Sequence, residues 1–127
     1  MEIKPVTLTG RHLRLEPLSM DHIADLDYAC KDSPDGRRTI WRYLLDARVY
    51  RDHGMAGLVT ALLGRQAAGT DLPFAMIDLK TGNAVGTTRF MEIEIENRVV
   101  EIGTFIGLNF QREGLNLESK QLMLKHA

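Results

Sequence analysis

The amino-acid sequence predicts a single α/β domain of the α+β kind, in which an N-terminal strand and helices precede an antiparallel three-strand meander, a loop and a last helix. Three observations predict this class. Apolar and polar residues alternate at 13–16, which is the period of a half-buried strand. Between residues 19 and 66, apolar residues recur every three or four positions, as on one face of a helix. From residue 72 to 106 the period returns to two, with turn residues between the runs.

Turn residues divide the helical region into three predicted helices and end the last of them. Ser19 is a suitable cap for the first helix, and the turn residues at 33–36 end it. Two further amphipathic helices are expected before and after Gly54, and the second should end near Gly69. The predicted apolar faces consist of Ile23, Leu26, Cys30, Trp41, Leu44, Leu45, Val49, Met55, Leu58, Val59, Leu62 and Leu63.

The meander is predicted from strands at 72–79, 84–95 and 98–106. Tight turns at 81–83 and 96–97 join them, and such short connections cannot link parallel neighbours. Strict alternation in the second strand would place one set of side chains on a common face, namely Val85, Thr87, Arg89, Met91, Ile93 and Ile95. The last helix begins at Gly114, with Leu115, Ser119 and Leu122 on one face.

Composition limits the class of protein. With 127 residues, 44% hydrophobic and 26% charged, the chain fits one ordinary globular domain. A net charge of -1 gives no broad cationic field, so we expect no nucleic-acid partner. The single cysteine, Cys30, excludes an internal disulfide and fits a reducing compartment. The sequence shows no membrane span or signal peptide, so the cytoplasm is the expected location and no membrane partner is expected.

The loop at 107–116 carries the strongest chemical signal. Gly114 precedes a helix, where backbone can approach a ligand closely and free N–H groups point outward. A helix N-terminus favours a phosphate, and Arg112 adds a cation beside it. Taken alone, the loop is also compatible with a simple turn.

The run Gln111-Arg112-Glu113-Gly114-Leu115-Asn116 resembles the Q/R-x-x-G-x-G/A pyrophosphate loop of the GNAT superfamily of N-acetyltransferases, with Asn116 in place of the last small residue. Four segments follow the order seen in the ribosomal-protein N-acetyltransferase-like branch: TGRHLRLEPLSMDHIADL, TGNAVGTTRF, VEIGTFIG and GLNLESKQLMLKHA. The last of them matches a Gly-x-Asn-x-Glu-x-Lys run that often opens the helix of that branch, through Gly114, Asn116, Glu118 and Lys120. Together they cover nearly all of the chain and imply a GNAT-like fold.

The resemblance implies transfer of an acetyl group from acetyl-coenzyme A to a primary amine of a protein N-terminus or small molecule, without a metal. It implies that the third meander strand binds the pantetheine arm through its backbone and that the loop binds the pyrophosphate. The implied cofactor-binding residues are Thr104, Phe105, Ile106, Gln111, Arg112, Glu113, Gly114, Leu115 and Asn116.

Glu101 is the carboxylate that the resemblance places near the acceptor amine, as a direct or water-mediated general base. The alternative is that Glu101 is a solvated strand residue or a partner of Arg89 or Arg98. Trp41 and Tyr43 are expected to line the acceptor pocket, and Arg89 is the third predicted substrate-binding residue. For Trp41 the alternative is core packing, because it starts an apolar stripe.

Other reactive side chains favour structural roles. Glu92, Glu94 and Glu96 are typical of a solvated strand face rather than a metal cluster. The four histidines, His12, His22, His53 and His126, lack zinc-ligand spacing. Cys30 is expected to be a core thiol.

The sequence departs from the family at its end. Family chains continue beyond the last helix through a parallel strand, a helix and two more strands, whereas here the helical pattern is still running at residue 127. We therefore expect residues 1–127 to be a single but incomplete acetyltransferase domain, C-terminally truncated, that forms a homodimer through exposed edges. The alternative function is a non-catalytic module that binds coenzyme A weakly or only self-associates. A third interpretation is an unrelated α/β ligand-binding domain.

Overall fold

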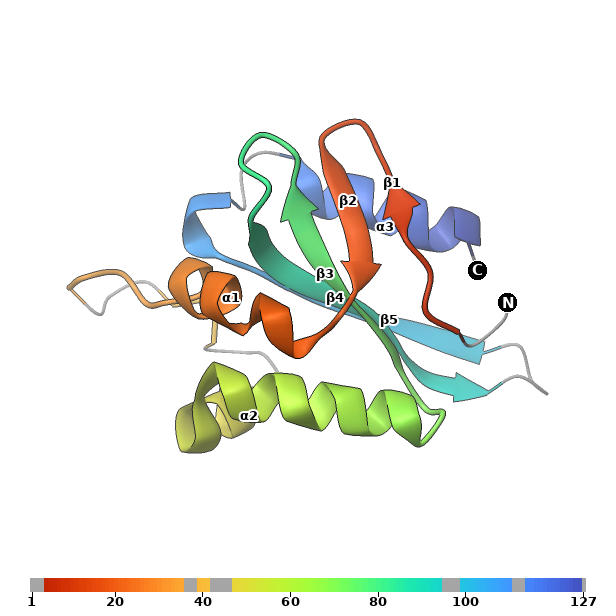
Figure 1. The fold of residues 1–127 in the computed structure, drawn as a ribbon, viewed down its shortest axis with the longest axis horizontal. Coiled ribbons are helices and arrows are strands. Elements are labelled where there is room, and N and C mark those ends of the chain that lie inside the picture. Colours follow the sequence, from red (N-terminus) through yellow and green to blue (C-terminus); the bar gives the residue numbers. More distant parts are fainter. Residues whose placement is uncertain (1–3, 36–38, 42–46, 95–98, 111–113, 127) are drawn as a thin grey trace.

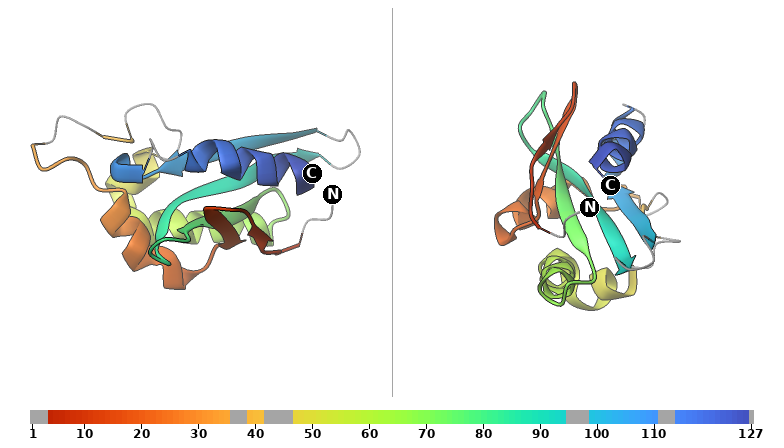
Figure 2. Two further views of the ribbon diagram at one scale, coloured as in Figure 1. Left: turned by 90° about the horizontal axis from the view of Figure 1, so that it is seen from above. Right: turned by 90° about the vertical axis from the view of Figure 1, so that its right-hand side faces the viewer.

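The computed structural model describes residues 4–35, 39–41, 47–94, 99–110 and 114–126. Its centre is a five-stranded antiparallel sheet with the strand order β1-β2-β3-β4-β5. Helices α1 and α2 cover one face of the sheet, and α3 covers the other (Figures 1 and 2). The α+β class is confirmed, and the sheet takes in the N-terminal strand as well as the predicted meander.

The bounds of the elements agree closely with the sequence pattern. The strands are β1 Leu8–Thr9, β2 Leu13–Pro17, β3 Leu72–Asp78, β4 Ala84–Glu94 and β5 Val99–Ile106. The helices are α1 Ile23–Ala29, α2 Ala47–Ala67 and α3 Leu115–His126, with short 3-10 turns at Met20–His22 and Leu108–Phe110.

Three local signals in the helical region are confirmed. Ser19 caps the turn into α1, with its hydroxyl accepting the N–H of Asp21 at 3.3 Å. Gly54 has a φ of 70° and interrupts α2, as its position between two apolar stripes predicts. Gly69, with a φ of 82°, follows the end of α2. The part of the predicted stripe at residues 42–46 lies outside the described residues.

Two apolar cores lie on the two faces of the sheet. The core under α1 and α2 consists of Leu18, Leu26, Cys30, Trp41, Ala47, Met55, Leu58, Val59, Leu62, Ala75, Ile77, Ala84 and Phe105. The core under α3 consists of Leu13, Leu15, Leu72, Phe74, Met76, Val85, Phe90, Ile106, Leu115 and Met123. The predicted apolar face of α2 after Gly54 is therefore buried, which is what holds an amphipathic helix on a sheet.

The predicted alternation of β4 is wrong at two places. Met76 pairs with Gly86 but Ile77 pairs with Ala84, so Val85 is an extra residue at a bulge and enters the core under α3. A second irregularity between Met91 and Glu94 brings Ile93 to that core as well. The bulges shift these two side chains to the opposite face from Thr87 and Arg89. Ile95 lies outside the described residues.

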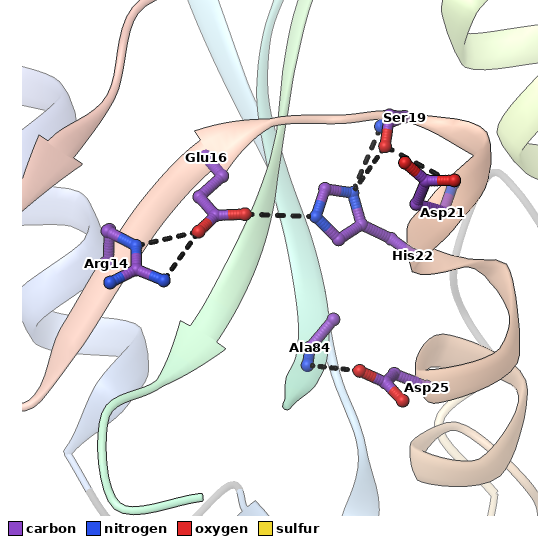
Figure 3. Close-up of polar contacts among 7 residues, drawn as sticks. All are labelled: Arg14, Glu16, Ser19, Asp21, His22, Asp25 and Ala84. Carbon is purple, nitrogen blue, oxygen red and sulfur yellow. Dashed lines mark hydrogen bonds and ion pairs between the residues drawn. The ribbon is translucent and has the colours of Figure 1, made fainter. Parts of the chain in front are cut away.

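A polar network fixes the turn from β2 into α1 (Figure 3). Arg14 donates from Nε to Glu16 Oε1 at 2.8 Å, and Glu16 Oε2 lies 3.2 Å from His22 Nε2. The Ser19 N–H donates to His22 Nδ1 at 3.1 Å, so the imidazole proton is on Nε2 and points at Glu16. Asp25 of α1 accepts the N–H of Ala84 at 3.3 Å and ties the helix to β4.

This network sets the ionisation of Glu16. Partial burial acts to raise the pKa of the Glu16 carboxyl, but hydrogen bonds from Arg14 and His22, with the charge of Arg14, outweigh burial and lower the pKa below its usual value. A carboxyl with a lowered pKa in the folded state stabilises the fold above its unfolded pKa, and this stability is lost as pH falls through the folded value.

Glu16→Gln should therefore lower the free energy of unfolding by about 1 kcal/mol near neutral pH, because two partners lose their acceptor charge. The difference from the native protein should shrink as pH falls through the folded-state pKa of the Glu16 carboxyl, which lies below its usual value. Urea denaturation over a pH series measures this. Asp52→Asn is the control, because Asp52 is exposed on α2 and its Oδ2 is as far as 3.9 Å from Nε of its exposed ion-pair partner, Arg48. A deficit that stays constant down to acid pH would contradict the assignment.

Candidate functional site

The connection from β5 to α3 is built against the end of α1. The Gly107 N–H donates to Val85 O at 2.9 Å, and the Phe110 N–H donates to Gly107 O at 3.0 Å. A Cβ atom at Gly107 would lie 2.1 Å from Ala29 O, which no side chain tolerates. Gly107 therefore lets the α1 backbone touch the start of the loop.

Gly114 begins α3 from a left-handed conformation, with a φ of 75°. The Glu118 N–H donates to Gly114 O at 3.1 Å, so the N–H groups of the residues between them have no acceptor within the helix. A Cβ atom at Gly114 would meet no atom of the described residues within 4 Å, so these residues leave open space beside this helix end. These are the features that the predicted anion-binding loop requires. Gln111, Arg112 and Glu113 lie outside the described residues.

The two other predicted loop residues have different surroundings. The side chain of Leu115 is buried in the core under α3, so its predicted ligand contact is left to its backbone. Asn116 is exposed, and its carbonyl accepts the Ser119 hydroxyl at 2.8 Å.

The predicted pantetheine strand is β5. The side chains at its end already have partners within the protein. The Thr104 hydroxyl is hydrogen-bonded to the Thr88 hydroxyl at 2.8 Å. Phe105 packs in the core under α1 and α2, and Ile106 packs in the core under α3. The backbone of Thr104, Phe105 and Ile106 is what such a strand would offer a ligand. This role stays a prediction.

Glu101 is an exposed residue of β5, opposite Met91 of β4. Within the described parts of the chain, its carboxylate has no hydrogen-bond or ion-pair partner. The proposed pairing with Arg89 is therefore not observed, and Arg98 lies outside the described residues. Glu101 is available to meet a ligand.

Arg89 is buried, in contrast to the predicted contact with a substrate. Its side chain is 4% exposed, and its Nε lies 3.2 Å from Oδ2 of Asp71, which is equally buried. Arg65 Nη1 lies 3.8 Å from the same oxygen. A Cβ atom at Gly103 of β5 would be 3.8 Å from Arg89 Cζ, so the guanidinium lies against β5. The position supports a structural role for Arg89.

Trp41 also belongs to the core, at 2% exposure. Its indole N–H donates to Cys30 O at 3.0 Å, its ring stacks on Tyr50 at 4.1 Å, and Phe105 packs against it at 5.1 Å. The core interpretation of Trp41 is the one that the packing supports, and the predicted pocket role is not supported. Tyr43 lies outside the described residues.

Cys30 is a buried thiol, as predicted. Burial, followed by the charge of Asp27, raises the pKa of the Cys30 thiol to about 12, which makes it unreactive at neutral pH. Over the described residues, no three His, Cys, Asp or Glu side chains come together in a group able to hold a metal ion. None of the described helices is both long enough and apolar enough to cross a bilayer.

Sequence reasoning missed a cavity of about 530 Å³ beside the start of α3. Its lining consists of Arg11, His12, Asp78, Leu79, Lys80 and Leu115. Three segments far apart in the sequence form it, so no local pattern indicates it.

Comparison with known proteins agrees with this geometry. The family model for the acetyltransferase (GNAT) domain matches residues 12–127. A search of curated proteins finds no match.

Several solved structures share the fold. A GCN5-related N-acetyltransferase from Brucella melitensis is 24% identical, with a TM-score of 0.69, over 97% of this chain and 54% of its own. A candidate acetyltransferase from T. thermophilus is 27% identical, with a TM-score of 0.78, over 99% and 62%. RimL, a ribosomal L7/L12 alpha-N-protein acetyltransferase in complex with coenzyme A, is 17% identical, with a TM-score of 0.76, over 95% and 67%.

The chain thus spans between 54% and 67% of the length of these three structures. The family model, by contrast, matches well over half of the chain, and the fold agrees with it from β2 to α3. This chain therefore belongs to the acetyltransferase (GNAT) domain family.

Proposed function

We propose that this chain binds acetyl-coenzyme A and takes part in transfer of its acetyl group to a primary amine, in the cytoplasm. The observation that carries the proposal is the helix end at Gly114, with its left-handed φ of 75° and open space where a Cβ atom would lie. Unpaired N–H groups and the helix dipole attract a pyrophosphate there. The backbone of Thr104, Phe105 and Ile106 would receive the pantetheine arm, and residues 111–116 would surround the pyrophosphate.

Glu101 is the proposed general base. An ammonium group cannot attack a thioester, so one proton must leave the acceptor before its nitrogen bonds to the carbonyl carbon. The carbon–sulfur bond then breaks, the nitrogen loses its second proton, and the departing thiolate takes up a proton to leave as the free thiol of coenzyme A. Glu101 is exposed and without a partner in the described structure, so it is free to take that proton directly or through a water. The acceptor proposed is the amine of a protein N-terminus or of a small molecule.

Gly114→Val should weaken binding of acetyl-coenzyme A at least about tenfold, because a branched side chain fills the space that the pyrophosphate needs and disfavours a positive φ. Isothermal titration measures the affinity. Gly69→Val is the matched control, since Gly69 also has a positive φ and open surroundings but lies far along the chain, after α2. Equal affinity of the native protein and Gly114→Val would contradict the proposal.

A second candidate is a module that only self-associates or binds coenzyme A weakly. It is favoured by β5, which pairs with β4 alone among the described strands and so offers its other edge to a second copy. Light scattering with intact-mass measurement tests for the homodimer. Release of thiol from acetyl-coenzyme A over a panel of amines then separates an enzyme from a binding module.

A further inference from the structure

The cavity beside α3 lies where two turns meet the first turn of the helix. Arg11 and His12 come from the β1–β2 turn, and Leu115 comes from α3. Asp78 ends β3, and Leu79 and Lys80 begin the turn between β3 and β4. Figure 1 shows both turns at the same end of the sheet. A volume of about 530 Å³ is in the range of pockets that hold small molecules.

A carboxylate from α3 holds the β1–β2 turn in place. Glu118 accepts the N–H groups of Arg11 and His12, the latter at 3.1 Å. A Cβ atom at Gly10 would lie 2.6 Å from Glu118 Oε1, so the carboxylate is fitted closely against the turn. The Leu79 N–H donates to His12 O at 3.1 Å and joins the two turns. The bonds use the backbone of Arg11 and His12, and their side chains line the cavity.

The lining is cationic. Arg11 and Lys80 have no ion-pair partner in the described parts of the chain, and His12 adds an imidazole to the same lining. Asp78 is the carboxylate among the lining residues, and it is buried with its Oδ1 accepting the Lys80 N–H at 3.1 Å. Leu79 supplies exposed apolar surface beside these groups, while the side chain of Leu115 is buried in the core under α3.

From this juxtaposition we infer that the cavity is a binding site for the phosphate monoester of a small organic molecule. A phosphate monoester carries a charge of about −1.5 to −2, which two cations and an imidazole complement better than they do a carboxylate. The planar guanidinium of Arg11 suits bidentate contact with phosphate, while the exposed side chain of Leu79 accommodates an apolar part of the ligand. The ester has two possible sources: the 3′-phosphate of coenzyme A, or a separate phosphorylated metabolite. Only the first rests on the proposed function.

The test uses the full chain and three probes. Inorganic phosphate is titrated at constant ionic strength while the backbone amide signals of the two turns are followed by NMR, and coenzyme A and dephospho-coenzyme A are titrated by calorimetry. The variant is Arg11→Gln with Lys80→Gln, which keeps both backbone hydrogen bonds of the turns. The charge-matched control is Lys31→Gln with Lys125→Gln, two exposed lysines outside the cavity lining.

Saturable shifts of the turn amides with inorganic phosphate, weakened at least about tenfold in the variant and unchanged in the control, are the expected result. Tighter binding of coenzyme A than of dephospho-coenzyme A, lost in the variant, would identify the 3′-phosphate as the source. Equal binding of the two coenzymes, with phosphate still saturating, would identify a separate ligand. Saturation by phosphate without any coenzyme binding would refute the proposed function and leave the site standing. Shifts that do not saturate, or that the variant leaves unchanged, would overturn the inference.

Discussion

Arg89→Met should lower the free energy of unfolding by about 3–5 kcal/mol, because it leaves the buried carboxylate of Asp71 without its close partner. Both side chains are 4% exposed, and their charged atoms are 3.2 Å apart. Arg65 lies 3.8 Å from Asp71 but is half exposed, so it replaces little of the lost interaction. Urea denaturation of the native protein and the variant measures the difference.

The matched control is the double variant, Arg89→Met with Asp71→Asn. Removing both charges leaves neither member of this pair as an uncompensated buried ion among the described residues, so the double variant should recover much of the stability that Arg89→Met loses. The single variant Asp71→Asn completes the comparison. If the double variant loses as much free energy of unfolding as Arg89→Met and Asp71→Asn lose together, Arg89 and Asp71 act independently and their ion pair does not stabilise the fold.

The secondary structure was predictable where one residue type settles the backbone. Ser19 caps the 3-10 turn that leads into α1, and the positive φ of Gly54 and of Gly69 breaks or ends the helical pattern, so the local sequence suffices for these. Strand β1 escaped prediction because two residues are too few to show a period. The bulge at Val85 was also not predicted, because it depends on how β4 pairs with β3 and not on the sequence pattern of β4 alone.

The candidate site divides in the same way. The start of α3 could be predicted because Gly114 precedes a run of strong helix formers, whereas the pyrophosphate-binding role of the loop stays a prediction. The ion pair of Arg89 with Asp71 could not be predicted, since the two residues lie far apart in the sequence and the burial of both arises only when the sheet forms. Trp41 was ambiguous because an aromatic residue that starts a helical stripe fits a pocket or a core equally well, and only the contacts with Cys30, Tyr50 and Phe105 separate the two.

The exposure of Glu101 makes the proposed chemistry testable without damage to the fold. Its carboxylate has no partner among the described residues, so Glu101→Gln removes a charge and a proton acceptor but no packing contact. A change in turnover can then be assigned to chemistry rather than to unfolding, provided that the free energy of unfolding and the affinity for acetyl-coenzyme A stay unchanged.

Glu101→Gln should lower the kcat of acetyl transfer by ~10²-fold, because an amide cannot accept the proton that the acceptor ammonium must lose. The rise of kcat with pH should flatten in the variant, since the titrating base is gone, while the KM for acetyl-coenzyme A stays within about twofold. Thiol release over a pH series measures both. Asp52→Asn is the control for a general effect of charge, because it removes an exposed carboxylate from α2 rather than from β5. Near-normal kcat with an unchanged pH profile in Glu101→Gln would assign the proton transfer to water or to another group.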